Sequence, residues 1–245
     1  MQLPPYDPEI VVEMYLEDGK PLQCLVTESL PYTDTGINKL IDSALVIFSD
    51  GTHYDTLKNE LQEDYETGRN YNYFNPEILI ADNSKTYSIY VSDGRRTVTG
   101  TTSFSQTLVQ IDSIDVKASV NKKDTFSLGV IISDPPKTND FYRFLITKKL
   151  NDFVSEPTDL SVNDNSFNGK QYSFYTEPAY ARNDSVIVRV YSLQQEHYDY
   201  IQSTRDARSS NFNPFSQPAL IKSNVAGGIG IFTSIRFVQR LVIIR

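Results

Sequence analysis

The sequence alternates apolar and polar residues, and this period of two constrains the fold more than any other feature. Within residues 87–92, Tyr87, Ile89 and Val91 take every second position, and residues 113–120 alternate in the same way. Successive side chains of a β-strand point to opposite faces, so such a segment buries one face and exposes the other. The 16 Tyr and 13 Phe residues also favour strands over helices. We therefore expect a protein made mainly of β-sheet.

Short reversals separate these alternating segments. The pairs Asp18-Gly19, Asp50-Gly51 and Asp93-Gly94 each follow a run rich in β-forming residues. Asp-Gly is favoured in two-residue hairpins because the type I′ turn needs a positive φ at both central positions. We expect three antiparallel hairpins here, within an immunoglobulin-like sandwich of about seven strands that spans residues 8–107.

A second domain is expected over residues 108–245, because a chain of 245 residues suits two domains. Ser192-Leu-Gln-Gln195 has the spacing of a capping box and predicts a helix over residues 194–209. The predicted fold class is therefore all-β, with two tandem antiparallel β-sandwich domains of immunoglobulin-like type and one short helix in the second. The strands of the second domain are separated by turns at residues 134–137, 163–169 and 182–184.

The formal net charge is −8, which disfavours general nucleic-acid binding because an acidic chain repels phosphates. No run of about 18 apolar residues is present, so we expect no membrane-spanning helix. The single cysteine, Cys24, lies in the apolar run 22–26 and is interpreted as a small core residue instead of a nucleophile. These features indicate a secreted-type β protein.

Few residues could carry catalysis or hold a metal. His53 and His197 lie in different predicted domains, and with one cysteine the chain cannot supply a Cys/His zinc set. Neither histidine accompanies a recognisable nucleophile, and no Gly-x-Ser-x-Gly motif is present. The carboxylates of residues 60–66 could form a glycosidase pair, but a solvated loop or helix face is the favoured interpretation. We predict no catalytic residues, no cofactor and no metal.

Two further segments have both a functional and a structural interpretation. Residues 163–169, Asn-Asp-Asn-Ser-Phe-Asn-Gly, offer oxygen ligands for calcium but lack the spacing of an EF-hand loop, which favours an Asx-stabilised turn. Residues 226–232 resemble a glycine-rich phosphate loop, yet the glycines lead into a strand instead of a helix. A tight bend or a close backbone approach is favoured there.

Tyr71, Tyr73 and Phe74 are the candidate residues for binding a ligand or a partner. They stand in the segment Tyr-Asn-Tyr-Phe-Asn-Pro, residues 71–76, where three aromatic rings accompany two amides. Such a mixture can stack on a sugar or anchor a protein interface. The alternative is that these rings cap the core of the first domain.

The C-terminal third carries motifs of a known family. A Tyr-rich stretch at 198–202 precedes Asn-Pro-Phe-Ser-Gln-Pro at 213–218 and Ser-Asn-Val-Ala-Gly-Gly-Ile-Gly-Ile-Phe at 223–232. In this order the motifs resemble a family of Bacteroidota envelope lipoproteins known as domain of unknown function 4249. Residues 139–144 and 44–51 resemble other parts of the same family.

The resemblance implies export, an N-terminal lipid anchor, a TonB-dependent (SusC-like) outer-membrane transporter as partner, and a glycan or peptide as ligand. It implies no catalytic residues. The lipid-bearing cysteine is expected upstream of Met1, because Cys24 lies within an expected strand. We therefore expect a non-enzymatic accessory lipoprotein of the outer membrane or cell surface, a binding component of a nutrient-uptake system. A structural or adhesive surface module without a transporter partner is the alternative, and a glycan hydrolase is a third hypothesis.

Overall fold

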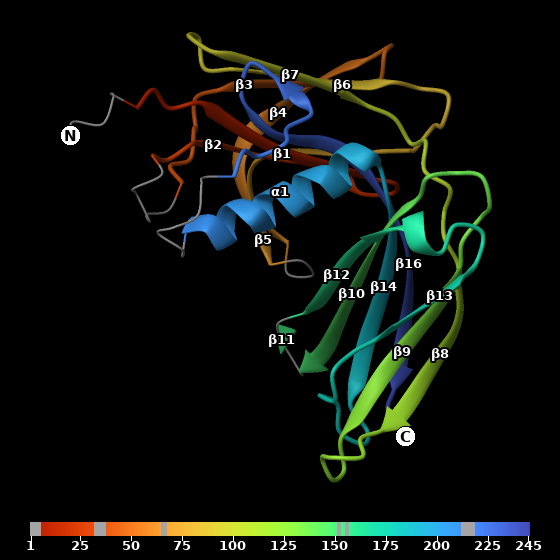
Figure 1. The fold of residues 1–245 in the computed structure, drawn as a ribbon. Coiled ribbons are helices and arrows are strands. Elements are labelled where there is room, and N and C mark those ends of the chain that lie inside the picture. Colours follow the sequence, from red (N-terminus) through yellow and green to blue (C-terminus); the bar gives the residue numbers. More distant parts are fainter. Residues whose placement is uncertain (1–5, 32–37, 65–67, 151–152, 155–156, 212–218) are drawn as a thin grey trace. The chain divides into compact units, whose positions relative to one another are not determined.

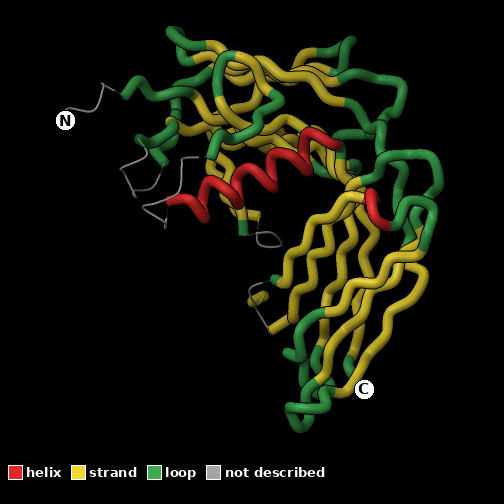
Figure 2. The backbone as a smooth tube through the Cα atoms, in the orientation of Figure 1, coloured by secondary structure: helices red, strands yellow, loops and turns green. Residues whose placement is uncertain are grey.

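The computed structural model describes residues 6–31, 38–64, 68–150, 153–154, 157–211 and 219–245 (Figure 1). The described residues are mainly β-strand, with one long helix, α1 (Gln195–Asn211), which Figure 2 shows in red. They form two compact units. Unit 1 contains Met1–Ser105 and Asp199–Ile235, and unit 2 contains Gln106–Tyr198 and Arg236–Arg245. None of the described helices is long and apolar enough to cross a membrane.

Unit 1 is built from two layers of strands (Figure 1). Its strands are β1 (Ile10–Glu17), β2 (Pro21–Glu28), β3 (Leu45–Ser49), β4 (Tyr54–Asp64), β5 (Arg69–Ile78), β6 (Tyr87–Ser92), β7 (Thr97–Thr102), β15 (Val225–Ala226) and the first part of β16 (Ile229–Ile243). The strands follow the order β16-β1-β2-β5-β4-β3-β6-β7-β15. Strand β4 joins the layers, because its first residues pair with β3 and its later residues with β5.

The core of unit 1 lies between these layers. Ile10, Val12, Met14 and Leu16 of β1 occupy every second position and are all buried, as the period of two requires. Cys24 is buried among them, as predicted, and burial raises the pKa of its thiol. A neutral, buried thiol is a packing group and not a nucleophile.

The first part of β16 completes unit 1. Strand β16 pairs with β1 in parallel, with Gly230 opposite Val12, whereas the sequence predicted antiparallel pairing throughout. Gly227 and Gly230 have φ values of 85° and 136°, and a Cβ atom on Gly228 or Gly230 would overlap the carbonyl oxygen of Ile10 or Val12. The predicted close backbone approach in this glycine-rich segment is therefore confirmed. The glycines are what allow β16 to lie against β1.

The predicted helix is present, beginning one residue after its expected start. The sequence placed residues 199–235 in the second domain, but in the structure the described residues of this range, 199–211 and 219–235, belong to unit 1. The later residues are held there by the pairing of β15 with β7 and of β16 with β1. In α1 the contact is made by the buried Tyr200, whose Oη donates a hydrogen bond to Glu13 Oε1 at 3.1 Å. Glu13 lies on the face of β1 opposite the core, so α1 covers the polar side of that strand.

Unit 2 is a β-sandwich of two antiparallel sheets. Its elements are β8 (Ile111–Ala118), β9 (Phe126–Ser133), β10 (Phe141–Leu150), β11 (Phe153–Val154), β12 (Thr158–Asn163), the 3₁₀ turn η1 (Asp164–Ser166), β13 (Gln171–Tyr175), β14 (Ser185–Leu193) and the last part of β16. One sheet has the order β13-β9-β8. In the other sheet β10 pairs with β11, β12 and β14, and β14 pairs in turn with β16. Val130, Phe144 and Val188 belong to the core that both sheets share.

Candidate ligand-binding site

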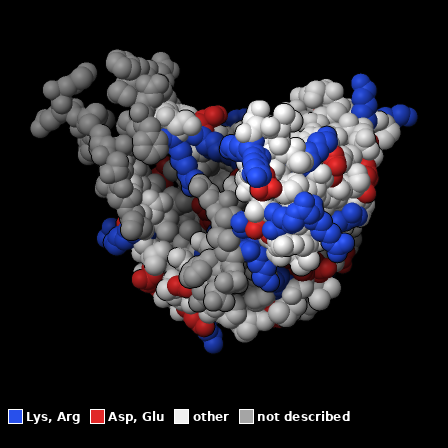
Figure 3. Space-filling view, turned by 90° about the horizontal axis from the view of Figure 1, so that it is seen from below, with Lys and Arg blue, Asp and Glu red and all other residues white. Residues whose placement is uncertain are grey.

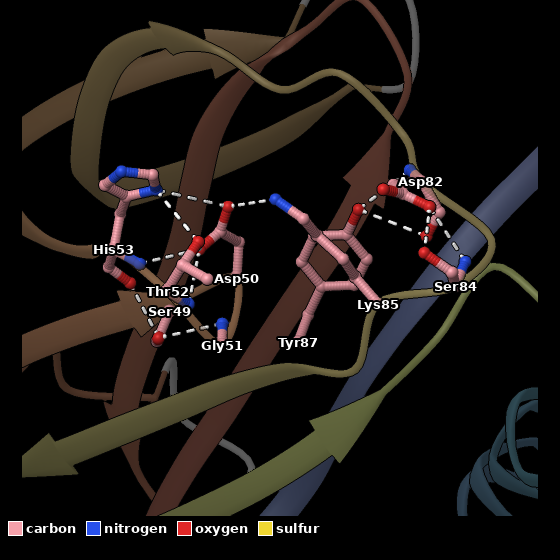
Figure 4. Close-up of polar contacts among 9 residues, drawn as sticks. All are labelled: Ser49, Asp50, Gly51, Thr52, His53, Asp82, Ser84, Lys85 and Tyr87. Carbon is pink, nitrogen blue, oxygen red and sulfur yellow. Dashed lines mark hydrogen bonds and ion pairs between the residues drawn. The ribbon is translucent and has the colours of Figure 1, made fainter.

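A Ser-Asp-Gly turn joins β3 to β4 and is held by its own side chains (Figure 4). Asp50 Oδ1 accepts hydrogen bonds from the backbone N–H groups of Thr52 and His53, at 2.9 and 2.7 Å. Ser49 Oγ donates to the carbonyl oxygen of His53 and accepts from the N–H of Gly51. Gly51 has a φ of 89°, which glycine adopts without strain. The side chains thus satisfy backbone groups that the loop leaves outside the strand ladder.

The loop is longer than predicted. Ser49 pairs with Tyr54, so residues 50–53 connect the strands, and the expected two-residue turn is wrong. The other two Asp-Gly hairpins have the loops 93–96 and 18–20. Both Ser-Asp-Gly loops are longer than two residues because of the aspartate. Its side chain accepts from the N–H groups two and three residues later, so those residues must lie inside the loop.

The same bonds recur in the turn between β6 and β7. Asp93 Oδ1 accepts from the N–H groups of Arg95 and Arg96, at 2.9 and 2.8 Å. Ser92 Oγ donates to the carbonyl oxygen of Arg96 and accepts from the N–H of Gly94. Because β3 and β6 are antiparallel neighbours, the two turns lie at opposite ends of this pair of strands. The repeated Ser-Asp-Gly tripeptide is the sequence signal that could have revealed this correspondence.

Asp50 uses its second oxygen to hold Lys85. The Nζ atom of Lys85 lies 2.6 Å from Asp50 Oδ2, and His53 Nδ1 lies 3.5 Å from the same oxygen. The hydrogen bond from Lys85, followed by those from the backbone of His53 and Thr52, lowers the pKa of Asp50 well below its usual range. The same bond raises the pKa of Lys85. Both groups stay charged near neutral pH, so the pair is a structural clamp and not an acid–base catalyst.

The clamp fastens a wall formed by residues 79–85. At its other end this wall is attached to the first Asp-Gly turn: Gly19 N–H donates to the carbonyl oxygen of Leu79 at 2.8 Å. The N–H of Leu79 donates to the carbonyl oxygen of Lys20, and the N–H of Ala81 donates to Asp18 Oδ1. Hydrogen bonds at both ends therefore hold the wall in place without the help of a ligand.

A cavity of about 210 Å³ lies beside this wall. Its apolar lining includes Leu22, Phe48 and Tyr87, which are all buried. The rings of Phe48 and Tyr87 stack with centroids 5.8 Å apart, and Tyr87 Oη accepts a hydrogen bond from the N–H of Asp82 at 2.9 Å (Figure 4). Pockets for drug-sized ligands are typically about 300–1,000 Å³, so this cavity suits a single side chain or small group.

The rim of the cavity combines acidic and aliphatic groups. Asp55 and Glu77 line it, and neither carboxylate has a hydrogen bond or ion pair with any described residue. Ile78 and Ile80, also at the rim, are 51% and 74% exposed. The exposed ring of His53 completes the polar edge. Available carboxylates beside apolar surface suit a ligand that carries a positive charge on an aliphatic stem.

A second cavity, of about 810 Å³, adjoins the Asp93 turn. Arg96, in its lining, pairs with Asp93 at 2.6 Å and with Glu28 at 2.9 Å, and donates to the carbonyl oxygen of Pro8. Burial raises the pKa of Asp93, but the N–H groups of Arg96 and Arg95 and the Arg96 guanidinium outweigh it and hold the pKa at about 2. The volume would admit a short peptide or sugar segment.

The predicted binding residues lie elsewhere, on β5. Tyr71 and Tyr73 are 6% and 1% exposed, and Phe74 is partly buried. The Oη of Tyr73 accepts from the N–H of Ala44 at 2.8 Å and donates to the carbonyl oxygen of Ile41 at 2.9 Å. The two tyrosine rings are therefore packing residues of unit 1, and the three side chains do not form an exposed aromatic platform.

The remaining candidates from the sequence are separate from one another. His53 lies at the rim of the smaller cavity, whereas His197 is buried in unit 2. Glu60 and Glu63 are exposed on β4, which is a strand and not the predicted loop or helix face. Glu66 lies outside the described residues. No described nucleophile and base are brought together by these positions.

The oxygen-rich segment in unit 2 forms the Asx turn that was favoured, since Asn163 Oδ1 accepts from the N–H of Asn165. It also places Asp164 beside Asp134 and Asp140, with carboxylate oxygens within 4.8 Å of one another. Burial, followed by the charges of Asp134 and Asp164, raises the pKa of Asp140. These three carboxylates could hold a hard cation. Sequence reasoning missed them as a group because they come from two separate turns.

Comparison with known proteins agrees with the motifs of the C-terminal third. No curated protein matches the chain. The model of the family described as "Domain of unknown function (DUF4249)" matches residues 1–240. Of the motifs that pointed to it, residues 213–218 lie outside the described part of the chain and residues 223–232 form the glycine-rich entry to β16. This chain therefore belongs to the DUF4249 family.

Proposed function

We propose that this protein is a non-enzymatic accessory lipoprotein of the outer membrane or cell surface that acts as a binding component of a TonB-dependent (SusC-like) nutrient-uptake system. Its lipid anchor would be attached upstream of Met1. Membership of the family supports the envelope role by the resemblance described above. The observation that carries the binding role is the small cavity of unit 1, whose wall is held by hydrogen bonds while its rim carboxylates have no described partner.

The rim favours a peptide with a cationic side chain over a neutral glycan. Asp55 and Glu77 would attract an ammonium or guanidinium group, and the exposed side chains of Ile78 and Ile80 would pack on its methylene stem. Sugar rings are commonly stacked on exposed aromatic faces. Phe48 and Tyr87 are only 2% and 1% exposed, so they offer no such face.

The ligand is tested by calorimetry with short peptides that differ in one residue, Lys, Arg, Gln or Glu, and with a panel of neutral oligosaccharides. We expect the Lys and Arg peptides to bind, and Glu77→Gln and Asp55→Asn to weaken that binding several-fold at low ionic strength. Glu63→Gln is the matched control, because Glu63 is an exposed carboxylate away from the cavity. Preference for a neutral sugar, or an equal loss in the control, would contradict the assignment.

The envelope role is tested with the full-length gene product in its own membranes. Metabolic labelling with a fatty acid should mark a cysteine upstream of Met1, and mild detergent extraction should recover a transporter barrel with the protein. Recovery of a labelled protein without any transporter would favour the structural or adhesive alternative. Turnover of a polysaccharide panel, abolished by one carboxylate substitution, would revive the hydrolase hypothesis.

We also propose that both units are immunoglobulin-like sandwiches in tandem. The layered core of each unit and its antiparallel hairpins support this. An experimental structure with a strand order foreign to such sandwiches would refute it.

A further inference from the structure

One end of unit 2 gathers basic side chains. We call it the basic end and define it by Lys122 and Lys123 in the turn between β8 and β9, Lys149 near the end of β10, and Arg182 in the turn before β14. All four side chains are exposed. Figure 3 looks toward this end of the unit, where Lys and Arg side chains are gathered. This local concentration stands out in a chain whose formal net charge is −8.

Backbone contacts hold these positions next to one another. The N–H of Phe126, at the start of β9, donates to the carbonyl oxygen of Tyr180 at 2.7 Å. The guanidinium carbon of Arg182 lies 5.7 Å from the centre of the Phe126 ring. Lys149 pairs with Ser185 at the start of β14. The four cations therefore belong to one end of the sandwich.

The cations of the basic end are not neutralised within the described structure. No described carboxylate lies within ion-pair distance of any of the four. The neighbouring Lys117 and Lys148 differ, because they pair with Asp115 at 3.3 Å and Asp184 at 2.7 Å. Asp124, in the same turn as Lys122, and Glu177, close to the start of β9, are exposed acids without such a pair. Four positive charges against two negative charges leave this end basic.

An aliphatic side chain stands among these charges. Val120 is 99% exposed in the β8–β9 turn, two residues before Lys122. An apolar side chain flanked by lysines matches the interfacial zone of a membrane, where the aliphatic group enters the acyl boundary and the cations meet headgroup phosphates. A stable protein interface instead needs about 800 Å² on each partner with a packed apolar centre, which one valine on a turn does not supply.

We propose that the basic end docks on an anionic lipid surface. Lys122, Lys123, Lys149 and Arg182 contact the headgroup phosphates, and Val120 enters the interface. Each cation near such a surface strengthens binding about five-fold, so the four together convert a negligible affinity into a measurable one. The interaction is independent of any ligand in unit 1.

The test is flotation of the whole chain with vesicles of phosphatidylcholine, with or without about one-third phosphatidylglycerol. We expect binding only to the anionic vesicles, and weakening as salt is added. The variant Lys122→Gln/Lys123→Gln/Lys149→Gln should bind on the order of a hundred-fold more weakly. Val120→Ser should weaken binding about five-fold without changing the charge.

The matched control is Lys20→Gln/Lys58→Gln/Lys170→Gln, which removes three exposed lysines that also lack described ion pairs. It changes the net charge equally and should bind as the parent does. Circular dichroism confirms that each variant is folded. Equal loss of binding in the control, unchanged binding in the test variant, or binding of the parent to soluble polyglutamate as tightly as to the vesicles would overturn the proposal.

Discussion

Replacing Asp50 by Asn or by Ala separates the two tasks of this side chain. Asn keeps an oxygen that can accept from the N–H groups of Thr52 and His53, but it loses the charge that holds Lys85. Ala loses both. Comparing the two variants therefore measures the clamp and the turn independently.

The magnitudes follow from the exposure of the groups. The side chains of Asp50 and Lys85 are 19% and 34% exposed, so water screens much of their attraction. We expect Asp50→Asn to lower the free energy of unfolding by about 0.5–1 kcal/mol. Asp50→Ala also leaves two backbone N–H groups without an acceptor, at about 1 kcal/mol each, for a total loss of about 3 kcal/mol.

The pH dependence has a definite sign. The folded-state pKa of Asp50 is lowered, so the charged carboxylate stabilises the protein above the unfolded-state pKa of about 3.9. Below that pH the unfolded state binds more protons, and the stabilisation is lost as the pH falls. The difference between parent and Asp50→Asn should stay constant from about pH 5 to 8 and shrink below about pH 4.

The assay is urea unfolding followed by far-ultraviolet circular dichroism, since the chain contains no Trp. Glu63→Gln serves as control, because it removes an exposed carboxylate that has no described partner. If Asp50→Asn is as stable as the parent to within about 0.3 kcal/mol at pH 7, the clamp contributes nothing and the reasoning fails.

Three further changes test other parts of the fold. Tyr73→Phe should cost about 1–2 kcal/mol in urea unfolding, because the N–H of Ala44 loses its acceptor and the buried carbonyl of Ile41 keeps only the bond from Asn72. Tyr54→Phe, on a 79% exposed side chain, should be neutral. Gly230→Ala should lower the free energy of unfolding by more than about 3 kcal/mol or prevent folding. Gly68→Ala, with open space around the added methyl group, should lower it by about 1 kcal/mol. Soluble yield and thermal unfolding measure both effects. The raised pKa of Asp140 means that the native state binds its proton more tightly than the unfolded state, so stability falls as pH rises through that pKa. Asp140→Asn should therefore gain stability over the parent at neutral pH and lose that advantage near pH 3, as measured by melting temperature across pH.

Strand positions were predictable because they depend on local alternation. The sequence predicted turns at 134–137 and 182–184, and in the structure β9 (Phe126–Ser133) ends just before the first and β14 (Ser185–Leu193) begins just after the second. In both strands the inward side chains are β-branched or aliphatic residues that fit a pleated sheet packed on a core. No long-range information is needed to recognise such a segment.

The pairing of distant strands was not predictable in the same way. Nothing local distinguishes a strand that closes its own sandwich from one that returns to an earlier edge, as β16 does beside β1. The sequence signal for this pairing is the set of glycines at 227, 228 and 230. A side chain at 228 or 230 would collide with the backbone of β1. Close approach could be predicted, but the strand that is approached could not.

The burial of Tyr71 and Tyr73 could not be settled from the sequence, for a different reason. Period-two reasoning lets one face of β5 reach solvent, yet Tyr71, Asn72 and Tyr73 are all buried. Asn72 takes part in this, because its side chain bonds both the N–H and the carbonyl oxygen of Val26 and so replaces a regular ladder pair. When a side chain takes a backbone's place in the hydrogen-bond ladder, the alternation of buried and exposed residues is interrupted. Aromatic residues on both sides of it can then be buried, although the sequence pattern suggests that one face is exposed.

The two proposed binding surfaces follow from one principle: a charge is available for recognition only where the fold has not already paired it. In unit 1, Asp50 and Asp93 are committed to backbone N–H groups and to cations, whereas Asp55 and Glu77 are not. In unit 2, Lys117 and Lys148 are paired, and the four cations of the basic end are not. The net charge of −8 predicts neither surface, because it sums the paired and unpaired groups alike. An acidic chain can therefore present an acidic pocket for a cation and a basic end for an anionic surface without contradiction.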